Sequence, residues 1–97
     1  MNRVADKDLH AIAARINREL GTPLESYTRD AEGKARACAG NYHISFAYGG
    51  ASLLQLVNES GGVRDVLMCG HIPRRELQTG MFAFIQGIYA GRGKVHV

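Results

Sequence analysis

The stretch GNYHISFAYGGASLLQL, residues 40–56, decides the fold. Its first half alternates with a period of two, which places Tyr42, Ile44 and Phe46 on one face of an extended strand. The Gly49-Gly50 pair that follows accepts the positive φ values of a tight turn. A second apolar run then returns in the opposite direction. The sequence therefore predicts a β-hairpin with one apolar face.

A third strand extends this hairpin. The second apolar run, residues 51–58, leads into a turn-forming Glu-Ser-Gly-Gly segment at residues 59–62. Apolar residues recur after that turn in residues 63–68. We therefore expect a three-stranded antiparallel meander over residues 41–68.

Apolar residues recur with helical spacing on both sides of the meander. One amphipathic stripe covers residues 6–20, and Gly21 followed by Pro23 ends it. The other stripe covers residues 73–90 and begins at a proline, which favours the first turn of a helix. Two helices that each carry one apolar stripe and a sheet with one apolar face are expected to pack together.

The expected architecture is an α+β fold of order α-β-β-β-α, a single domain over residues 1–97 with both helices on one face of the meander. Residues 22–40 show no clear period, and a loose strand pair and an ordered loop both fit them. Residues 92–97 are expected to form a frayed tail.

The composition fits a globular domain of mixed surface charge. Apolar residues make up 45% of the chain and charged residues 22%, with twelve Lys and Arg against nine Asp and Glu. The formal net charge of +3 is compatible with an acidic partner or a nucleic acid. No window approaches the roughly 18 apolar residues of a membrane span, and no secretion signal is recognised. Two cysteines are too few for a disulfide framework, so we expect a protein of the bacterial cytoplasm without a membrane partner.

Four residues form the one set that resembles a metal site: Cys38, His43, Cys69 and His71. Zinc accepts two thiolates and two imidazoles, but these spacings match no standard zinc knuckle. A catalytic thiol at Cys69, beside His71, lacks an orienting third group. We therefore predict a non-enzymatic protein without a cofactor, and a small zinc-binding protein is the second alternative.

Two features favour a binding surface. Arg74 and Arg75 open the second predicted helix, where positive charge opposes the helix dipole, so either they serve a contact with an anion, such as a phosphate or a partner's carboxylates, or they are two solvated arginines. Several aromatic residues are available to form a contact surface for a partner. The candidate binding residues are Arg74, Arg75, Tyr42, His43, Tyr48, Phe82 and Tyr89.

Four short motifs resemble a group of small uncharacterised proteins encoded by tailed bacteriophages and prophages. They are GNYH, AYGG, NE-x-GGV-x-D, and REL at the start of an aromatic-rich helix that ends in AG. The matching residues are Gly40 to His43, Ala47 to Gly50, Asn58-Glu59, Gly61 to Val63, Asp65, and Arg75 to Leu77. The resemblance implies a phage or prophage protein acting in a bacterial host cell, and it implies no activity.

The predicted order of elements also resembles the double-stranded RNA-binding domain, whose second helix opens with basic residues. Arg74 and Arg75 occupy that place, although no lysine cluster is present and His43 falls inside a strand. The leading hypothesis is a non-enzymatic binding module whose partner is a host or phage protein, with a second copy of the chain as a further possibility. A nucleic-acid-binding protein is the first alternative.

Overall fold

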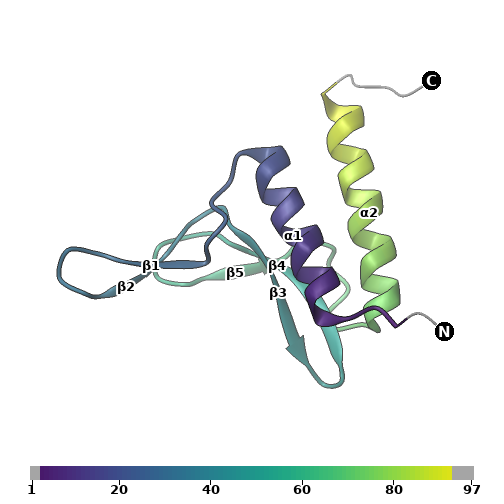
Figure 1. Cartoon of the computed structure of the whole chain (residues 1–97), viewed down its shortest axis with the longest axis horizontal. Helices are drawn as coiled ribbons and strands as arrows, with labels where there is room; N and C mark the ends of the chain where they lie inside the picture. The colour runs from purple at the N-terminus through teal and green to yellow at the C-terminus, as the bar shows by residue number, and fades with distance from the viewer. Residues whose placement is uncertain (1–2, 93–97) are drawn as a thin grey trace.

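The computed structural model describes residues 3–92 and shows two helices and five strands (Figure 1). The elements are α1 (Asp6–Leu20), β1 (Tyr27–Arg29), β2 (Ala35–Ala37), β3 (Tyr42–Ala47), β4 (Gly50–Leu56), β5 (Val63–Asp65) and α2 (Arg74–Gly91). The predicted α+β class is confirmed, and the predicted helix, meander and helix follow in the predicted order. Most of the predicted tail, residues 93–97, lies outside the described residues. Neither described helix is long and apolar enough to cross a membrane.

The meander is the sheet β3-β4-β5, antiparallel throughout, with Ile44 opposite Leu53. Its first turn lies one residue earlier than predicted. Tyr48 and Gly49 have φ values of 55° and 74°, and they form the two-residue turn itself. Gly50 is instead the first residue of β4, where an added Cβ would lie 2.8 Å from the carbonyl oxygen of Ile72. That glycine is therefore required for close packing rather than for the turn.

The third strand is shorter than predicted, because β5 ends at Asp65 rather than at residue 68. The Asp65 carboxylate accepts hydrogen bonds from the backbone amides of Met68, at 3.0 Å, and Gly70, at 2.7 Å. These bonds turn the chain away from the strand direction. The chain then returns at Ile72, which pairs with Ala51 of β4 and leads into α2.

The two helices lie side by side and run in the same direction on one face of the sheet (Figure 1). Arg74 of α2 pairs with Asp6 of α1 at 2.6 Å, and Arg92 pairs with Glu19 at 3.7 Å at the opposite ends of the helices. Parallel packing therefore brings both helix N-termini to one end of the molecule. The buried core between the helices and the sheet contains Leu9, Ile12, Ala13, Ile16, Tyr42, Ile44, Ala51, Leu53, Leu77, Met81 and Ile85.

Residues 22–40 contain a strand pair, which was one of the two structures that the sequence left open. β1 and β2 form a separate two-stranded sheet that extends away from the helices (Figure 1). Asp30 organises its turn by accepting the amides of Glu32 and Lys34, each at 2.9 Å. The amide of Lys34 is the main cause of the lowered pKa of the Asp30 carboxyl, followed by the guanidinium of Arg36.

The outer edge of β3 is closed at Tyr42 by a buried asparagine of α1. The side-chain Nδ2 of Asn17 donates a hydrogen bond to the Tyr42 carbonyl at 2.9 Å, and its Oδ1 accepts one from the Tyr42 backbone amide at 2.8 Å. Its oxygen also accepts the hydroxyl of Thr22 at 2.8 Å. Asn17 thus replaces a neighbouring strand at this point and ties α1 to the sheet edge.

Candidate functional site

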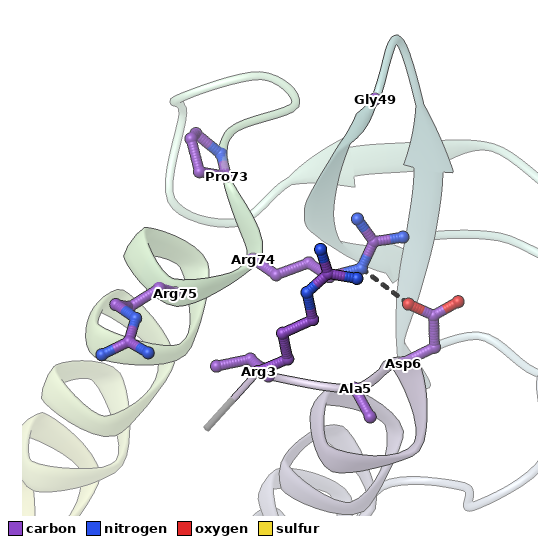
Figure 2. Close-up of a pocket in the computed structure, with 8 residues that line it drawn as sticks. Arg3, Ala5, Asp6, Gly49, Pro73, Arg74 and Arg75 are labelled. Carbon is purple, nitrogen blue, oxygen red and sulfur yellow. Dashed lines mark hydrogen bonds and ion pairs between the residues drawn. The ribbon is translucent and has the colours of Figure 1, made fainter. Parts of the chain in front are cut away.

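An open cleft lies where the N-termini of α1 and α2 meet the tip of the β3–β4 hairpin (Figure 2). Its volume is about 770 Å³. Three of the eight lining residues are arginines, one is an aspartate, and four are small or apolar. The lining residues are Arg3, Val4, Ala5, Asp6, Gly49, Pro73, Arg74 and Arg75.

Local sequence fixes both helix starts at this cleft. The Ala5 amide donates to the Asp8 carboxylate at 2.8 Å, which sets the first residue of α1 at Asp6. Pro73 precedes the first residue of α2 and has the extended ψ of a residue outside the helix, 142°. The first backbone N–H groups of each helix have no intrahelical acceptor, and the helix dipole makes both ends positive. Asp6 and Asp8 in the first turn of α1 and Glu76 in the first turn of α2 offset these helix ends, so the positive charge of the cleft comes from its arginines.

Arg74 is held in place by two partners. Its Nε lies 2.6 Å from an oxygen of Asp6, and its guanidinium carbon lies 5.2 Å from the centre of the Phe46 ring. The Phe46 ring is in turn packed edge-on against His10 of α1, at 5.5 Å between ring centres. Because three elements converge on this one guanidinium, its position is defined before any ligand arrives.

The cleft keeps an excess of positive charge although Asp6 lines it. Three guanidinium groups against one carboxylate leave a formal charge of +2 among the lining side chains. Figure 2 shows Arg3 and Arg74 in the middle of the cleft with Asp6, whereas Arg75 lies on the α2 side. Guanidinium groups bind carboxylates and phosphates through paired N–H donors, so the arrangement is suited to an anionic ligand.

Tyr48 lies in the turn between β3 and β4, immediately before the lining residue Gly49, and is not itself among the residues that line the cleft. Its side chain is 97% exposed, and its ring packs edge-on against His71, at 5.7 Å between ring centres. The imidazole Nε2 of His71 is 3.1 Å from the hydroxyl oxygen of Ser45 on β3. Because Ser45 alternates with Phe46 along β3, His71 and the Tyr48 ring lie on the face of the sheet opposite the Phe46 ring and Arg74.

The other aromatic candidates lie elsewhere. Tyr42 is only 6% exposed and packs against the ring of Phe84, so it belongs to the core rather than to a contact surface. The Tyr89 hydroxyl accepts a hydrogen bond from Arg15 at 2.8 Å, a contact that raises the pKa of that arginine and joins the two helices. Phe82 is 43% exposed on α2. The structure therefore does not gather these rings into one surface.

His43 is half-buried on β3, facing away from the core side of the sheet. Burial lowers the pKa of its imidazole, and its Nδ1 has no hydrogen-bond partner within residues 3–92. It lines a smaller hollow of about 190 Å³ between α1 and the start of β3, at a distance along β3 from the arginine cleft. This placement makes His43 relevant to stability at low pH rather than to the cleft.

The cysteines and histidines considered for zinc do not form a site in the described part of the chain, where no group of three or more potential ligands is placed to hold a metal ion. Cys38 lies at the end of β2, with its sulfur 3.8 Å from the Thr28 hydroxyl. Partial desolvation and the carboxylate of Asp65 raise the pKa of the Cys69 thiol, which disfavours a reactive thiolate there.

The sequence pointed to Arg74 and Arg75 but missed Arg3 and Asp6, which complete the cleft. No local sequence pattern marks these two residues, because only the parallel packing of α1 and α2 brings them close to arginines about 70 positions away in the chain. Comparisons of the chain with models of protein families, with curated proteins and with solved structures found no match. Function is therefore inferred from the residues of the cleft.

Proposed function

We propose that this protein is a non-enzymatic binding module that holds an acidic segment of a partner protein in the arginine cleft. The observation that carries the proposal is a cleft between two helix N-termini that three arginines line, with Arg3 and Arg74 in its middle and Arg75 on its α2 side (Figure 2). Carboxylates are the anions that a protein partner supplies, and paired guanidinium donors match their geometry. The resemblance to phage-encoded proteins extends the proposal to a host or phage protein as the partner.

The compact size of the charged site supports a short protein segment over an extended polyanion. Nucleic-acid duplexes are normally contacted over many phosphates, through basic residues spread along a surface. A single cleft of about 770 Å³ is closer in size to the sites that hold a few side chains.

The contact that most resembles a catalytic pair is the one between Ser45 and His71, and it lacks the third group that a nucleophilic serine uses. Ser45 and His71 are within hydrogen-bond distance, at 3.1 Å. A nucleophilic serine also requires an acid that orients its histidine. Both oxygens of the carboxylate of Asp65, six positions before His71, accept hydrogen bonds from backbone amides of the same loop. Binding is therefore the function that these residues support best.

Fluorescence anisotropy with a labelled peptide of eight glutamates tests the proposal. The double variant Arg3→Gln/Arg75→Gln keeps the Arg74–Asp6 ion pair and removes two positive charges from the cleft. We expect it to weaken binding by about tenfold, which corresponds to two partly exposed ion pairs. The control Arg18→Gln/Lys34→Gln removes the same charge from exposed positions outside the cleft and is expected to change binding less than twofold. Equal losses in the two variants would refute a specific site.

A second candidate function is binding of duplex RNA. The two arginines at the start of α2 line one cleft with Gly49 at the tip of the first hairpin, and the resemblance to the double-stranded RNA-binding domain implies basic residues at the start of the second helix. A gel shift with a 20-base-pair RNA duplex at low salt tests this candidate. Retarded bands that disappear steeply with added salt, and that the Arg3→Gln/Arg75→Gln variant lacks, would favour RNA over an acidic protein segment.

A further inference from the structure

The register between β3 and β4 turns one set of backbone groups of β3 away from the sheet. The Leu56 amide donates a hydrogen bond to the Asn41 carbonyl at 2.9 Å, so these two residues form a bonded pair of the ladder. Bonded and non-bonded pairs alternate along an antiparallel ladder. The N–H and C=O groups of Tyr42, Ile44 and Phe46 therefore point away from β4, toward the outer edge of β3.

Only the first of these three positions is closed. The side chain of Asn17 bonds both backbone groups of Tyr42, as a neighbouring strand would. Within residues 3–92, no hydrogen bond reaches the outward groups of Ile44 or Phe46, because β3 is the first strand of its sheet. Figure 2 shows the end of the β3–β4 hairpin projecting past the starts of both helices, with Gly49 at its tip. The outer edge of β3 thus presents two sites with which a further strand can pair.

The two edges of the three-stranded sheet differ in their protection against pairing. Proteins commonly protect an exposed edge by keeping the strand short or by placing charged residues or proline in it. The opposite edge strand, β5, has only three residues, and two of them are the charged Arg64 and Asp65. In contrast, β3 has six residues, YHISFA, and none is a lysine, arginine, aspartate, glutamate or proline. The edge of β3 is therefore the one suited to accept a strand.

The open part of the β3 edge adjoins the arginine cleft. The ring of Phe46 supports the guanidinium of Arg74, whose central carbon lies 5.2 Å from the ring centre. A residue bonded to Phe46 on an added strand has its Cα about 5.5 Å away and its side chain on the same face of the sheet. An acidic side chain at that position lies beside the Phe46 ring, on the face that carries Arg74. Backbone pairing at the edge and the positive charge of the cleft therefore favour the same ligand.

We propose that the acidic segment of the partner protein binds as an added β-strand on the outer edge of β3. This inference rests on the proposed function, because it gives the conformation and position of the segment that the cleft holds. The backbone of the segment pairs with Ile44 and Phe46, and the carboxylates on the face of the Phe46 ring contact the arginines. In this mode of recognition, main-chain hydrogen bonds provide affinity and side chains at alternate positions provide specificity.

Amide hydrogen exchange of the ¹⁵N-labelled protein, measured with and without a saturating amount of the peptide of eight glutamates, tests the inference. We expect the exchange of the Ile44 and Phe46 amides to slow by about tenfold or more in the complex, because each amide acquires a carbonyl acceptor. The Val63 amide is a matched control, because the register of β5 makes it face away from β4 in the same way. Its exchange should change less than twofold.

Two substitutions of Phe46 separate its backbone N–H from its ring. Phe46→Leu removes the ring and keeps the outward N–H, whereas Phe46→Pro removes both. An edge strand tolerates proline where the missing N–H faces outward. In fluorescence anisotropy, we expect Phe46→Pro to bind the peptide about fivefold more weakly than Phe46→Leu does, and equal affinities would contradict a hydrogen bond at this amide. The exchange measurement uses the unaltered protein, so it decides the question even if proline destabilises β3.

The outcomes distinguish this inference from the proposed function. If Arg3→Gln/Arg75→Gln weakens binding but the peptide leaves the exchange of Ile44 and Phe46 unchanged, strand addition is overturned and the cleft remains the binding site. Loss of that arginine dependence would overturn the proposed function as well. Slowed exchange of the same amides at high protein concentration without peptide, together with a doubled mass in sedimentation, would replace the partner segment by a second copy of the chain.

Discussion

Asn17→Ala is the substitution that tests most sharply how α1 is tied to the sheet. The side chain is 1% exposed and makes three hydrogen bonds, two with the backbone of Tyr42 and one with Thr22. Truncation to alanine removes all three bonds at once. It also leaves the amide and the carbonyl of Tyr42 without these partners in a buried position.

The expected loss follows from these bonds. Each contributes about 1 kcal/mol net to folding, and a buried backbone group left unpaired adds to the cost. Alanine recovers up to about 0.7 kcal/mol of helix propensity relative to asparagine. We therefore expect the free energy of unfolding to fall by about 2–3 kcal/mol. For a domain of this size that corresponds to a decrease in Tm of roughly 10–20 °C.

Urea denaturation monitored by circular dichroism measures this loss. The control Arg18→Ala changes the neighbouring exposed position of α1 and is expected to alter the free energy of unfolding by less than about 0.5 kcal/mol. A loss below about 1 kcal/mol for Asn17→Ala, or one no larger than that of Arg18→Ala, would refute the role assigned to Asn17 at the edge of β3.

Two further predictions concern packing and pH. Gly50→Ala places a Cβ within 2.8 Å of the Ile72 carbonyl oxygen and is expected to lower the free energy of unfolding by about 1–3 kcal/mol in urea denaturation. The added Cβ of Gly87→Ala in α2 meets nothing within 4 Å, so this variant is expected to raise the free energy of unfolding by about 0.5–1 kcal/mol. Equal effects of the two substitutions would contradict the role of Gly50 in close packing. Because the pKa of His43 is lowered in the folded state, the unfolded chain binds the proton more readily. The free energy of unfolding should therefore fall as the pH decreases below 6.5, the ordinary pKa of histidine. The His43→Gln variant should lose less of this free energy between pH 7 and pH 5 than the unaltered protein does. Identical pH dependence of the two proteins would contradict this prediction.

Much of the fold was predictable because periodicity is a local signal. The helix predicted at residues 6–20 coincides with α1, and the helix predicted at 73–90 differs from α2 by one residue at each end. The strands β1 and β2 were not assigned because each has only three residues and is largely exposed, so no apolar alternation marks them. The turn was displaced by one position because Gly50 was assigned to the turn, whereas it is needed for contact with Ile72.

The candidate site was only partly predictable. Arg74 and Arg75 were noticeable because they oppose the dipole of their own helix, which is a local conflict. Arg3 and Asp6 carry no such conflict, and their importance depends on the parallel arrangement of the two helices. Tyr48 was grouped with Tyr42, Phe82 and Tyr89 because residue type alone does not distinguish a core ring from one at a hairpin tip. Burial and the positive φ of Tyr48 make that distinction.

The most direct test of the central claim is a map of backbone amide chemical shifts during titration with the peptide of eight glutamates, recorded on uniformly ¹⁵N-labelled protein. An anionic ligand in the arginine cleft is expected to shift most strongly the amides of the two helix starts and the hairpin tip, at Ala5, Gly49, Arg74 and Arg75. Added salt should reverse these shifts in proportion to the loss of binding. Shifts centred on the β1–β2 hairpin, or distributed evenly over basic residues of the whole surface, would contradict the account.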